Sequence, residues 1–195
     1  MDSKRLLDVT VGSLGLVVAA PILAGVAIAM RLSGDRGPFI YRARRLGEGT
    51  SIITVLKVRT MNQGAGGQKL TIAADLRVTP LGRVLRRYRI DELPQLVNVV
   101  RGEMSLVGPR PEDPSYVDLS NPLHQRVFSA KPGITGLAQL VFHDEAKRLR
   151  GTEAERRYRD EILPEKLRLD ATYLDRRTML LDLKILFRTI RAVLE

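Results

Sequence analysis

Residues 9–30 read VTVGSLGLVVAAPILAGVAIAM, an apolar stretch of 22 residues without a charged side chain. As a straight helix it measures about 33 Å, which is enough to span the hydrocarbon core of a bilayer. Pro21 lies near the middle and lacks an N–H, so a helix is expected to lose one hydrogen bond and kink there. Each arm then measures roughly 15 Å, too short to cross alone. The segment predicts either a kinked spanning helix or a re-entrant helix broken at Pro21, with both ends on one side of the membrane.

Basic residues lie on both sides of the apolar segment. Lys4 and Arg5 precede it, and arginines follow at positions 31, 36, 42, 44 and 45. The pattern Ala27-Ile28-Ala29 also permits a secretory signal peptide, and a buried core helix is a further alternative. However, the segment is longer than a usual signal-peptide core, and the basic run after it resists translocation. The domain that follows, residues 33–195, is therefore expected to be cytoplasmic, and residues 1–32 are expected to form the membrane unit.

The composition restricts the chemistry of the chain. Its 195 residues, 44% of them hydrophobic, suit one globular domain. It contains no Cys, and its two histidines, His124 and His143, stand apart from each other. Thiolate sites, disulfides and a transition-metal centre are therefore not expected, and any metal would be a hard cation on carboxylates.

The net charge of +10 is concentrated in one part of the chain. Residues 31–110 carry 15 Lys and Arg against 6 Asp and Glu, whereas residues 111–195 carry 15 against 14. Such a local excess predicts a surface for phosphates, on nucleic acid, anionic lipid or a small molecule. Only 5% of the residues are aromatic, and no stacking pattern is evident, which argues against nucleic acid.

Local patterns predict an α+β fold that is mostly helical. The β-branched runs 39–41 and 51–58 predict a short β-hairpin. Apolar spacing over residues 81–90 predicts an amphipathic helix, and residues 153–172 are helix-compatible around Pro164. A C-terminal amphipathic helix is expected over 179–194, within 178–195. Its apolar side, with Leu180, Leu183, Phe187, Ile190 and Leu194, is expected to pack on the core, and the alternative is an interfacial helix at the membrane surface.

The adjacent carboxylates Asp91 and Glu92 are the leading chemical candidates. Asp91 before Pro94 looks like the N-cap of a restarted helix, where the helix dipole would help a carboxylate nucleophile meet a phosphate. Glu92 could bind Mg²⁺, which prefers one or two carboxylates plus phosphate oxygens. An ordinary helix start would give the same two residues.

A second candidate is the stretch Gly108-Pro109-Arg110-Pro111. Two prolines restrict the backbone on both sides of Arg110, so its guanidinium is pre-organised for bidentate phosphate contact. A rigid surface turn with an incidental arginine remains the alternative.

Seven stretches occur in one order along the chain: KRLLD (4–8), KVRTM (57–61), LGR (81–83), DELPQL (91–96), GEMSLVGPRP (102–111), PGITGLAQ (132–139) and DLKIL (182–186). With these, nearly the whole chain resembles the bacterial initiating sugar transferases, the monotopic phosphoglycosyl transferases. The resemblance implies a re-entrant helix broken at Pro21 and a small cytosolic catalytic domain with interfacial helices, placed on the cytoplasmic face of a bacterial inner membrane. It also implies a role in the first membrane step of glycoconjugate synthesis.

The resemblance further implies the reaction and the role of each site residue. Asp91 attacks the β-phosphate of a nucleotide diphosphate sugar, usually a UDP-sugar, and UMP leaves. Polyprenyl (undecaprenyl) phosphate then displaces Asp91, so the kinetics are ping-pong. The resemblance makes Glu92, beside Asp91, the Mg²⁺ ligand, and the basic residues expected to hold phosphates are Lys57, Arg86 and Arg110.

Two departures from the family pattern bear on these expectations. Ala20 precedes Pro21 where family members often have Ser, which removes a hydroxyl that could satisfy the backbone freed at the kink. Residues 140–168 lack the Asn-Gly-Arg and Trp pattern common in the family, and this region is expected to help select the sugar. The sugar and the pathway therefore stay open, as does the oligomeric state, for which a homodimer is one option.

Overall fold

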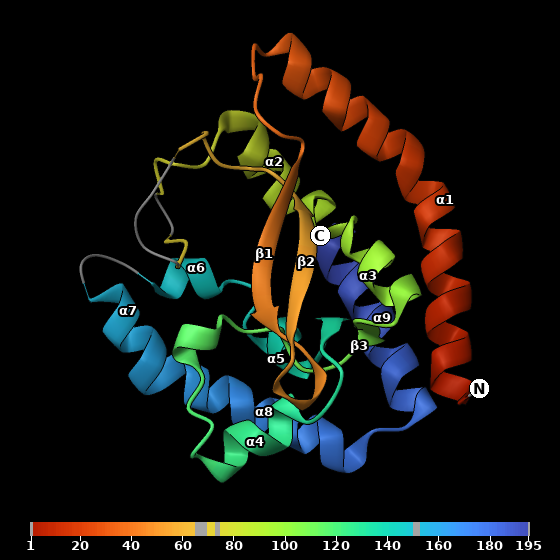
Figure 1. The fold of residues 1–195 in the computed structure, drawn as a ribbon, viewed down its shortest axis with the longest axis vertical. Coiled ribbons are helices and arrows are strands. Elements are labelled where there is room, and N and C mark those ends of the chain that lie inside the picture. The colour runs from red at the N-terminus through yellow and green to blue at the C-terminus, as the bar shows by residue number, and fades with distance from the viewer. Residues whose placement is uncertain (1, 65–69, 73–74, 150–152, 195) are drawn as a thin grey trace.

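The computed structural model describes residues 2–64, 70–72, 75–149 and 153–194. Figure 1 shows a long helix, α1 (Ser3–Leu32), running along one side of a globular body, with a two-stranded hairpin at the centre and helices below and behind it. Most of the described residues are helical, as the sequence predicts.

Helix α1 is continuous, so the predicted break at Pro21 takes the form of a bend. The helical backbone runs from Ser3 to Leu32 with Pro21 inside it, and Figure 1 shows its C-terminal part leaning over the body. The loss of one hydrogen bond at a proline permits bending without ending the helix. Only 17% of its most apolar 18-residue window is buried. This excludes a buried core helix.

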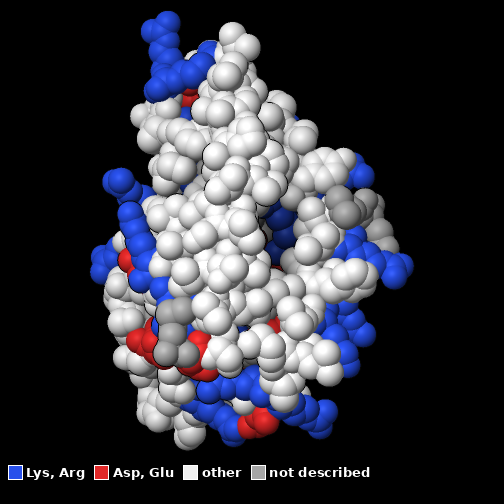
Figure 2. Space-filling view, turned by 90° about the vertical axis from the view of Figure 1, so that its right-hand side faces the viewer, with Lys and Arg blue, Asp and Glu red and all other residues white. Residues whose placement is uncertain are grey.

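Two glycines let α1 pack closely on the globular body. Gly12 and Gly15 face helix α3 (Gln95–Arg101), and a Cβ at Gly15 would lie 3.1 Å from Leu96 Cδ1. The opposite side of α1 is apolar and exposed, with Leu14 63% and Val17 72% accessible. Figure 2 shows this face as a broad uncharged strip with Lys and Arg around its edges.

Four side chains tie the start of α1 to the body, and we call them the N-terminal clasp: Lys4, Asp8, Tyr173 and Asp182. Lys4 Nζ lies 2.5 Å from Asp182 Oδ2 and donates to the Val107 carbonyl at 3.0 Å. The Tyr173 hydroxyl donates to Asp182 Oδ1 at 2.7 Å. Asp8 Oδ1 accepts from the Leu106 N–H at 2.9 Å. The clasp therefore joins α1 to strand β3 (Ser105–Val107) and to helices α8 (Leu163–Arg176) and α9 (Met179–Leu194).

The predicted hairpin is confirmed. Strands β1 (Ile40–Leu46) and β2 (Ile52–Val58) pair antiparallel, with Ile40 opposite Val58 and Leu46 opposite Ile52. The connecting turn contains Gly49 in the left-handed region, at φ 62°, which glycine adopts without steric cost. Val55 and Ala43 point into the core.

A second, parallel pair of strands was not predicted. Strand β3 runs beside β4 (Gly133–Thr135), so the Gly108–Pro111 stretch begins where β3 ends. Glycines make this contact feasible, because a Cβ on Gly133 would lie 2.1 Å from Gly108 N and one on Gly136 would lie 2.3 Å from Gly108 O. The motifs 102–111 and 132–139 therefore form one unit.

Helices make up most of the remaining chain; the helices predicted near 81–90 and over 153–172 are present, whereas those over 122–128, 137–141 and 145–148 were not predicted. Helix α8 follows α7 (Ala154–Arg157) and a π-helical turn (Tyr158–Ile162), and Pro164 lies in its first turn. The other helices are α2 (Pro80–Arg87), α4 (Pro122–Phe128), α5 (Leu137–Val141) and α6 (Glu145–Arg148).

The apolar side of α9 that was expected to pack on the core is instead exposed. Leu180 is 62%, Phe187 69% and Ile190 61% accessible. The helix packs through another face, on which Ile185 is 2% accessible and Leu181 and Leu186 are partly buried. This face carries Asp182 of the clasp, which explains the rotation of the helix.

Candidate active site

Asp91 and Glu92 lie in a 3-10 turn between two helices. Helix α2 ends at Arg87, and Arg89 takes a left-handed conformation with φ 51°, which is strained for a residue other than glycine. The 3-10 turn spans Ile90–Glu92, and α3 begins at Gln95 with Pro94 at its N-cap. The prediction that Asp91 caps this helix is therefore wrong, because the chain needs one more turn to bring Pro94 to a position where its missing N–H costs nothing.

Cations hold the Glu92 carboxylate. Lys57 Nζ, from β2, donates to Glu92 Oε1 at 2.8 Å, and Arg89 Nη1 lies 3.4 Å from Oε2. Burial opposes the charge on Glu92, but Lys57, Arg110 and Arg89 outweigh it and lower the pKa to about 2. Glu92 is therefore ionised at neutral pH.

The Asp91 carboxylate is buried and, unlike that of Glu92, has no side-chain hydrogen-bond donor in the described ranges. Asp91 is 8% accessible. Burial, followed by the negative charge of Glu92, raises the pKa of Asp91 to about 6, although Lys57 and Arg86 act in the opposite direction. At neutral pH this carboxylate is mostly ionised yet poorly solvated, as a nucleophile requires.

Two arginines bring further positive charge to the same turn. Arg86 donates to the hydroxyls of Thr60 at 2.8 Å and Thr71 at 3.0 Å. Burial lowers the pKa of its guanidinium, while the nearby Asp91 charge favours the ionised form. Arg110 lies in the loop after β3. Burial opposes its charge, but Glu92 and two other glutamates outweigh burial and raise its pKa.

The structure thus brings five predicted residues into one electrostatic cluster: Lys57, Arg86, Asp91, Glu92 and Arg110. Pro21 does not belong to it and lies exposed on α1. Arg89, which holds Glu92, was missed by the sequence analysis. Its position two residues before Asp91, within an arginine-rich stretch, could have indicated that it belongs to the site.

A buried polar network behind Arg110 was also missed. Lys166 Nζ donates to Glu112 Oε1 at 2.8 Å, to Glu145 Oε2 at 2.8 Å and to the Tyr158 hydroxyl at 3.0 Å. Tyr158 in turn donates to Glu112 Oε2 at 2.8 Å. This network supplies the two glutamates that favour charge on Arg110. Nothing in the charged sequence 153–172 marked Tyr158 and Lys166 as buried.

The Arg110 backbone has a further support. Its N–H donates to Asp170 Oδ2 at 3.3 Å, and burial raises the pKa of Asp170 to about 7. The loop that carries Arg110 is therefore held from α8 as well as by its two prolines.

Asp91 and Glu92 suit Mg²⁺ better than a metal held by protein groups alone. Within the described ranges, no group of three His, Cys, Asp or Glu side chains is arranged to hold a metal ion. Mg²⁺ commonly binds through one or two carboxylates and completes its shell with water and phosphate oxygens. Burial, followed by the charge of Glu92, raises the pKa of Asp91, and a cation bound between the two carboxylates would act in the opposite direction.

Comparison with known proteins identifies the family of the chain. The sequence profile of a family described as bacterial sugar transferase matches residues 2–195. The chain belongs to this family. The match includes α1 and every residue of the cluster around Asp91 and Glu92.

Three relatives of this family member carry descriptive names. A UDP-glucose:undecaprenyl-phosphate glucose-1-phosphate transferase of Caulobacter vibrioides is 39% identical over 98% of the chain and 69% of the relative. An undecaprenyl-phosphate glucose phosphotransferase of Komagataeibacter xylinus is 38% identical over 98% and 36%. A UDP-N-acetylgalactosamine-undecaprenyl-phosphate N-acetylgalactosaminephosphotransferase of Aeromonas hydrophila is 33% identical over 98% and 43%. The chain therefore spans about two thirds of the first relative and less than half of the other two.

Proposed function

We propose that the chain is a phosphoglycosyl transferase that moves a sugar 1-phosphate from a UDP-sugar to polyprenyl (undecaprenyl) phosphate and releases UMP. The observation that supports this most strongly is the setting of Asp91, a buried carboxylate with a raised pKa among Lys57, Arg86 and Glu92. The three relatives share an undecaprenyl phosphate acceptor in their names, but the names give two different sugars. The proposal therefore leaves the sugar open.

In the first step, an Asp91 carboxylate oxygen attacks the β-phosphorus of the UDP-sugar. A bond forms between this oxygen and phosphorus, the bond from phosphorus to the bridging oxygen breaks, and UMP leaves with the electron pair. Arg86 and Arg110 neutralise the charge that develops on the phosphate oxygens. Lys57 and Arg89 keep Glu92 ionised and fixed beside the reacting group.

In the second step, a phosphate oxygen of the polyprenyl phosphate attacks the same phosphorus. The bond from phosphorus to Asp91 breaks, the carboxylate is restored, and a polyprenyl diphosphate sugar forms. Asp91 suits both steps, because its pKa of about 6 makes it a better leaving group than a hydroxyl while it remains mostly ionised at pH 7.

Mg²⁺ belongs to the same proposal. Glu92, with Asp91, would hold the ion, which would supply charge neutralisation at the diphosphate when bound. Removal of divalent cations with EDTA should therefore abolish UMP release, and added Mg²⁺ should restore it. Full turnover in EDTA would exclude this part of the proposal.

The covalent step is tested by supplying UDP-sugar without a lipid acceptor. Chain purified in detergent should release UMP in a burst of at most one equivalent and should retain labelled sugar phosphate. Asp91→Asn should retain none, because an amide cannot form the phosphate ester. Label retained in Asp91→Asn, or UMP release that requires the acceptor, would contradict the covalent route. A panel of UDP-sugars would identify the donor.

For the topology, we propose that α1 is re-entrant and that the catalytic domain lies on the cytoplasmic face of a bacterial inner membrane. The N-terminal clasp holds the first turns of α1 on the body, and Met30, near its other end, packs with Val58 and Leu85. A helix that crosses a bilayer carries its two ends to opposite sides, whereas both ends of α1 contact one domain.

A unique cysteine tests this topology, since the chain has none. Ser3 is exposed, so Ser3→Cys should react with a membrane-impermeant maleimide only after the cytoplasmic side has been opened. Labelling in intact cells from the periplasmic side would contradict the re-entrant arrangement.

A further inference from the structure

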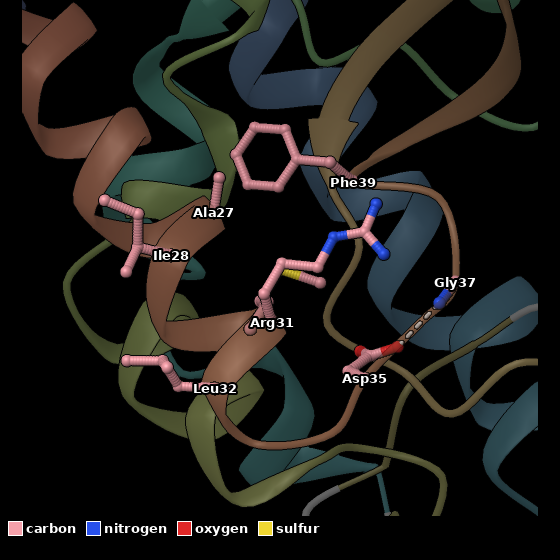
Figure 3. A pocket seen from close by; sticks show the side chains of 8 residues that line it. Ala27, Ile28, Arg31, Leu32, Asp35, Gly37 and Phe39 are labelled. Atoms are coloured by element: carbon pink, nitrogen blue, oxygen red, sulfur yellow. Dashed lines mark hydrogen bonds between the residues drawn. The ribbon is translucent and has the colours of Figure 1, made fainter.

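A pocket of about 380 Å³ lies at the C-terminal end of α1, outside the residues assigned to the active site. Ala27, Ile28 and Leu32 form its wall on the helix, and Phe39 lies on the opposite side (Figure 3). The apolar wall is continuous with the exposed face of α1, on which Ile28 is 60% and Leu32 83% accessible. An apolar chain could therefore run from the pocket along the helix.

Asp35 and Gly37 both line the pocket, and Arg59 holds Asp35 and neutralises its charge. Arg59 Nη2 donates to Asp35 Oδ1 at 2.6 Å, and the Gly37 N–H donates to the same oxygen at 3.0 Å. Arg59 also donates to the carbonyls of Pro38 and Met61. A Cβ at Gly37 would lie 2.6 Å from Arg59 Nη2, so a side chain there would push the guanidinium away from its present position. This gives a role to Arg59 of the KVRTM motif.

Arg31 supplies a cation that this pair does not neutralise. Figure 3 shows the side chain of Arg31, an exposed residue that lines the pocket, reaching from α1 toward Phe39. No described residue forms a hydrogen bond or ion pair with the Arg31 guanidinium, and its charge acts on Asp35 only through space. Because Asp35 is already paired with Arg59, the pocket carries a net charge of about +1 from its fixed groups.

We propose that this pocket binds the phosphodiester of a membrane glycerophospholipid, with the phosphate on Arg31 and the start of an acyl chain against Ile28 and Leu32. A guanidinium offers two parallel N–H donors to a phosphate, and the pocket wall offers an apolar surface. The phosphatidyl group presents one negative charge above two acyl chains, which matches one unpaired cation above an apolar helix face. A bound lipid would brace the end of α1 against residues 35–39.

The charge also argues for this lipid rather than for the polyprenyl acceptor. A phosphate monoester carries up to two negative charges and must reach Asp91, around which Lys57, Arg86 and Arg110 are gathered. The single cation at Arg31 suits a monoanion. This inference rests on the membrane placement in the proposed function, and only its choice of a phospholipid over polyprenyl phosphate uses the proposed transfer at Asp91.

The test is a lipid titration of the full chain in detergent without UDP-sugar, with phosphatidylglycerol adducts counted by native mass spectrometry. Arg31→Gln should weaken binding of the first lipid about tenfold, the loss expected for one charge-assisted contact. Arg36→Gln is the matched control, because it removes an exposed arginine that does not line the pocket, and it should change binding less than about twofold.

A second pair of variants tests the cavity apart from its charge. Ala27→Phe should fill the pocket and weaken first-lipid binding, whereas Val18→Phe, at a 66% exposed position of the same helix more than two turns away, should not. Glycerophosphoglycerol, the deacylated phosphodiester with the same single negative charge and no acyl chains, should not displace the lipid.

Three results would overturn the proposal: equal weakening by Arg31→Gln and Arg36→Gln, unchanged binding in Arg31→Gln, or displacement of phosphatidylglycerol by an equal concentration of polyprenyl phosphate. The outcome is separable from the transferase activity. UMP release is measured without phospholipid, so either proposal can fail while the other stands.

Discussion

The active-site turn and the N-terminal clasp both bury aspartates beside a lysine, but they satisfy them differently. In the clasp, Asp182 is bound by Lys4 and by the Tyr173 hydroxyl, and Asp8 accepts from a backbone N–H and from the Ser105 hydroxyl. In the turn, Lys57 binds Glu92 and leaves Asp91 without a donor among the described side chains. A buried carboxylate that accepts hydrogen bonds from two donors stabilises a fold, whereas one left without a side-chain donor can react.

The largest effect should separate the two regions by activity. Asp91→Asn should lower the rate of UMP release at least about 1,000-fold, because it removes the nucleophile. Asp182→Asn is the matched control in the clasp, and it should lower the rate per folded molecule by less than about tenfold. Steady-state UMP formation, normalised to the folded fraction, measures both. Equal losses in the rate of UMP release would show that Asp91, like Asp182, affects activity only through the folded structure.

The sequence predicted the chemistry of the turn better than its geometry. The family resemblance pointed to Asp91, Glu92, Lys57, Arg86 and Arg110, and the structure places them in one cluster. The N-cap prediction failed because a short polar residue before a proline also fits a 3-10 turn, and the left-handed Arg89 that makes the difference has no local signature.

Long-range contacts could not be predicted at all. The parallel pairing of β3 with β4 depends on backbone approach at Gly108 and Gly133, which are far apart in the chain. The partners of Lys4 lie more than a hundred residues away, so the sequence showed it only as a basic residue before the apolar segment and not as part of a clasp. Periodicity likewise defined α9 but not the face that it buries.

The second effect should appear in stability. Lys4→Met leaves Asp182, which is 3% accessible, without its cation, and should lower the free energy of unfolding by about 3 kcal/mol. Lys184→Met makes the same change at an exposed position of α9 and should stay within about 0.5 kcal/mol of wild type. Chemical denaturation in detergent measures the difference. If the two variants were equally stable, the clasp would not be a structural unit.

The third effect has the opposite sign. The pKa of Asp91 is raised from 3.8 to about 6, so the folded state holds its proton more tightly than the unfolded chain, and ionised Asp91 destabilises the fold above pH 6. Asp91→Asn should therefore stabilise the protein by about 2 kcal/mol at pH 7.5. The gain should shrink as the pH falls from 6 and vanish below about 4. Destabilisation at pH 7.5 would mean that Asp91 acts as a structural carboxylate, like those of the clasp.

The smallest effect concerns the pH dependence of wild-type turnover. The attacking form of Asp91 is ionised, so the rate of UMP release at low UDP-sugar concentration should fall about tenfold per pH unit below about pH 6. Glu92, with its pKa lowered to about 2, stays ionised throughout this range and adds no second step. Asp182→Asn should keep the same midpoint, because the clasp lies outside the reacting groups. A midpoint near 4 would show that the cations around Asp91 outweigh its burial, and the turn would then resemble the clasp in leaving no carboxylate unsatisfied.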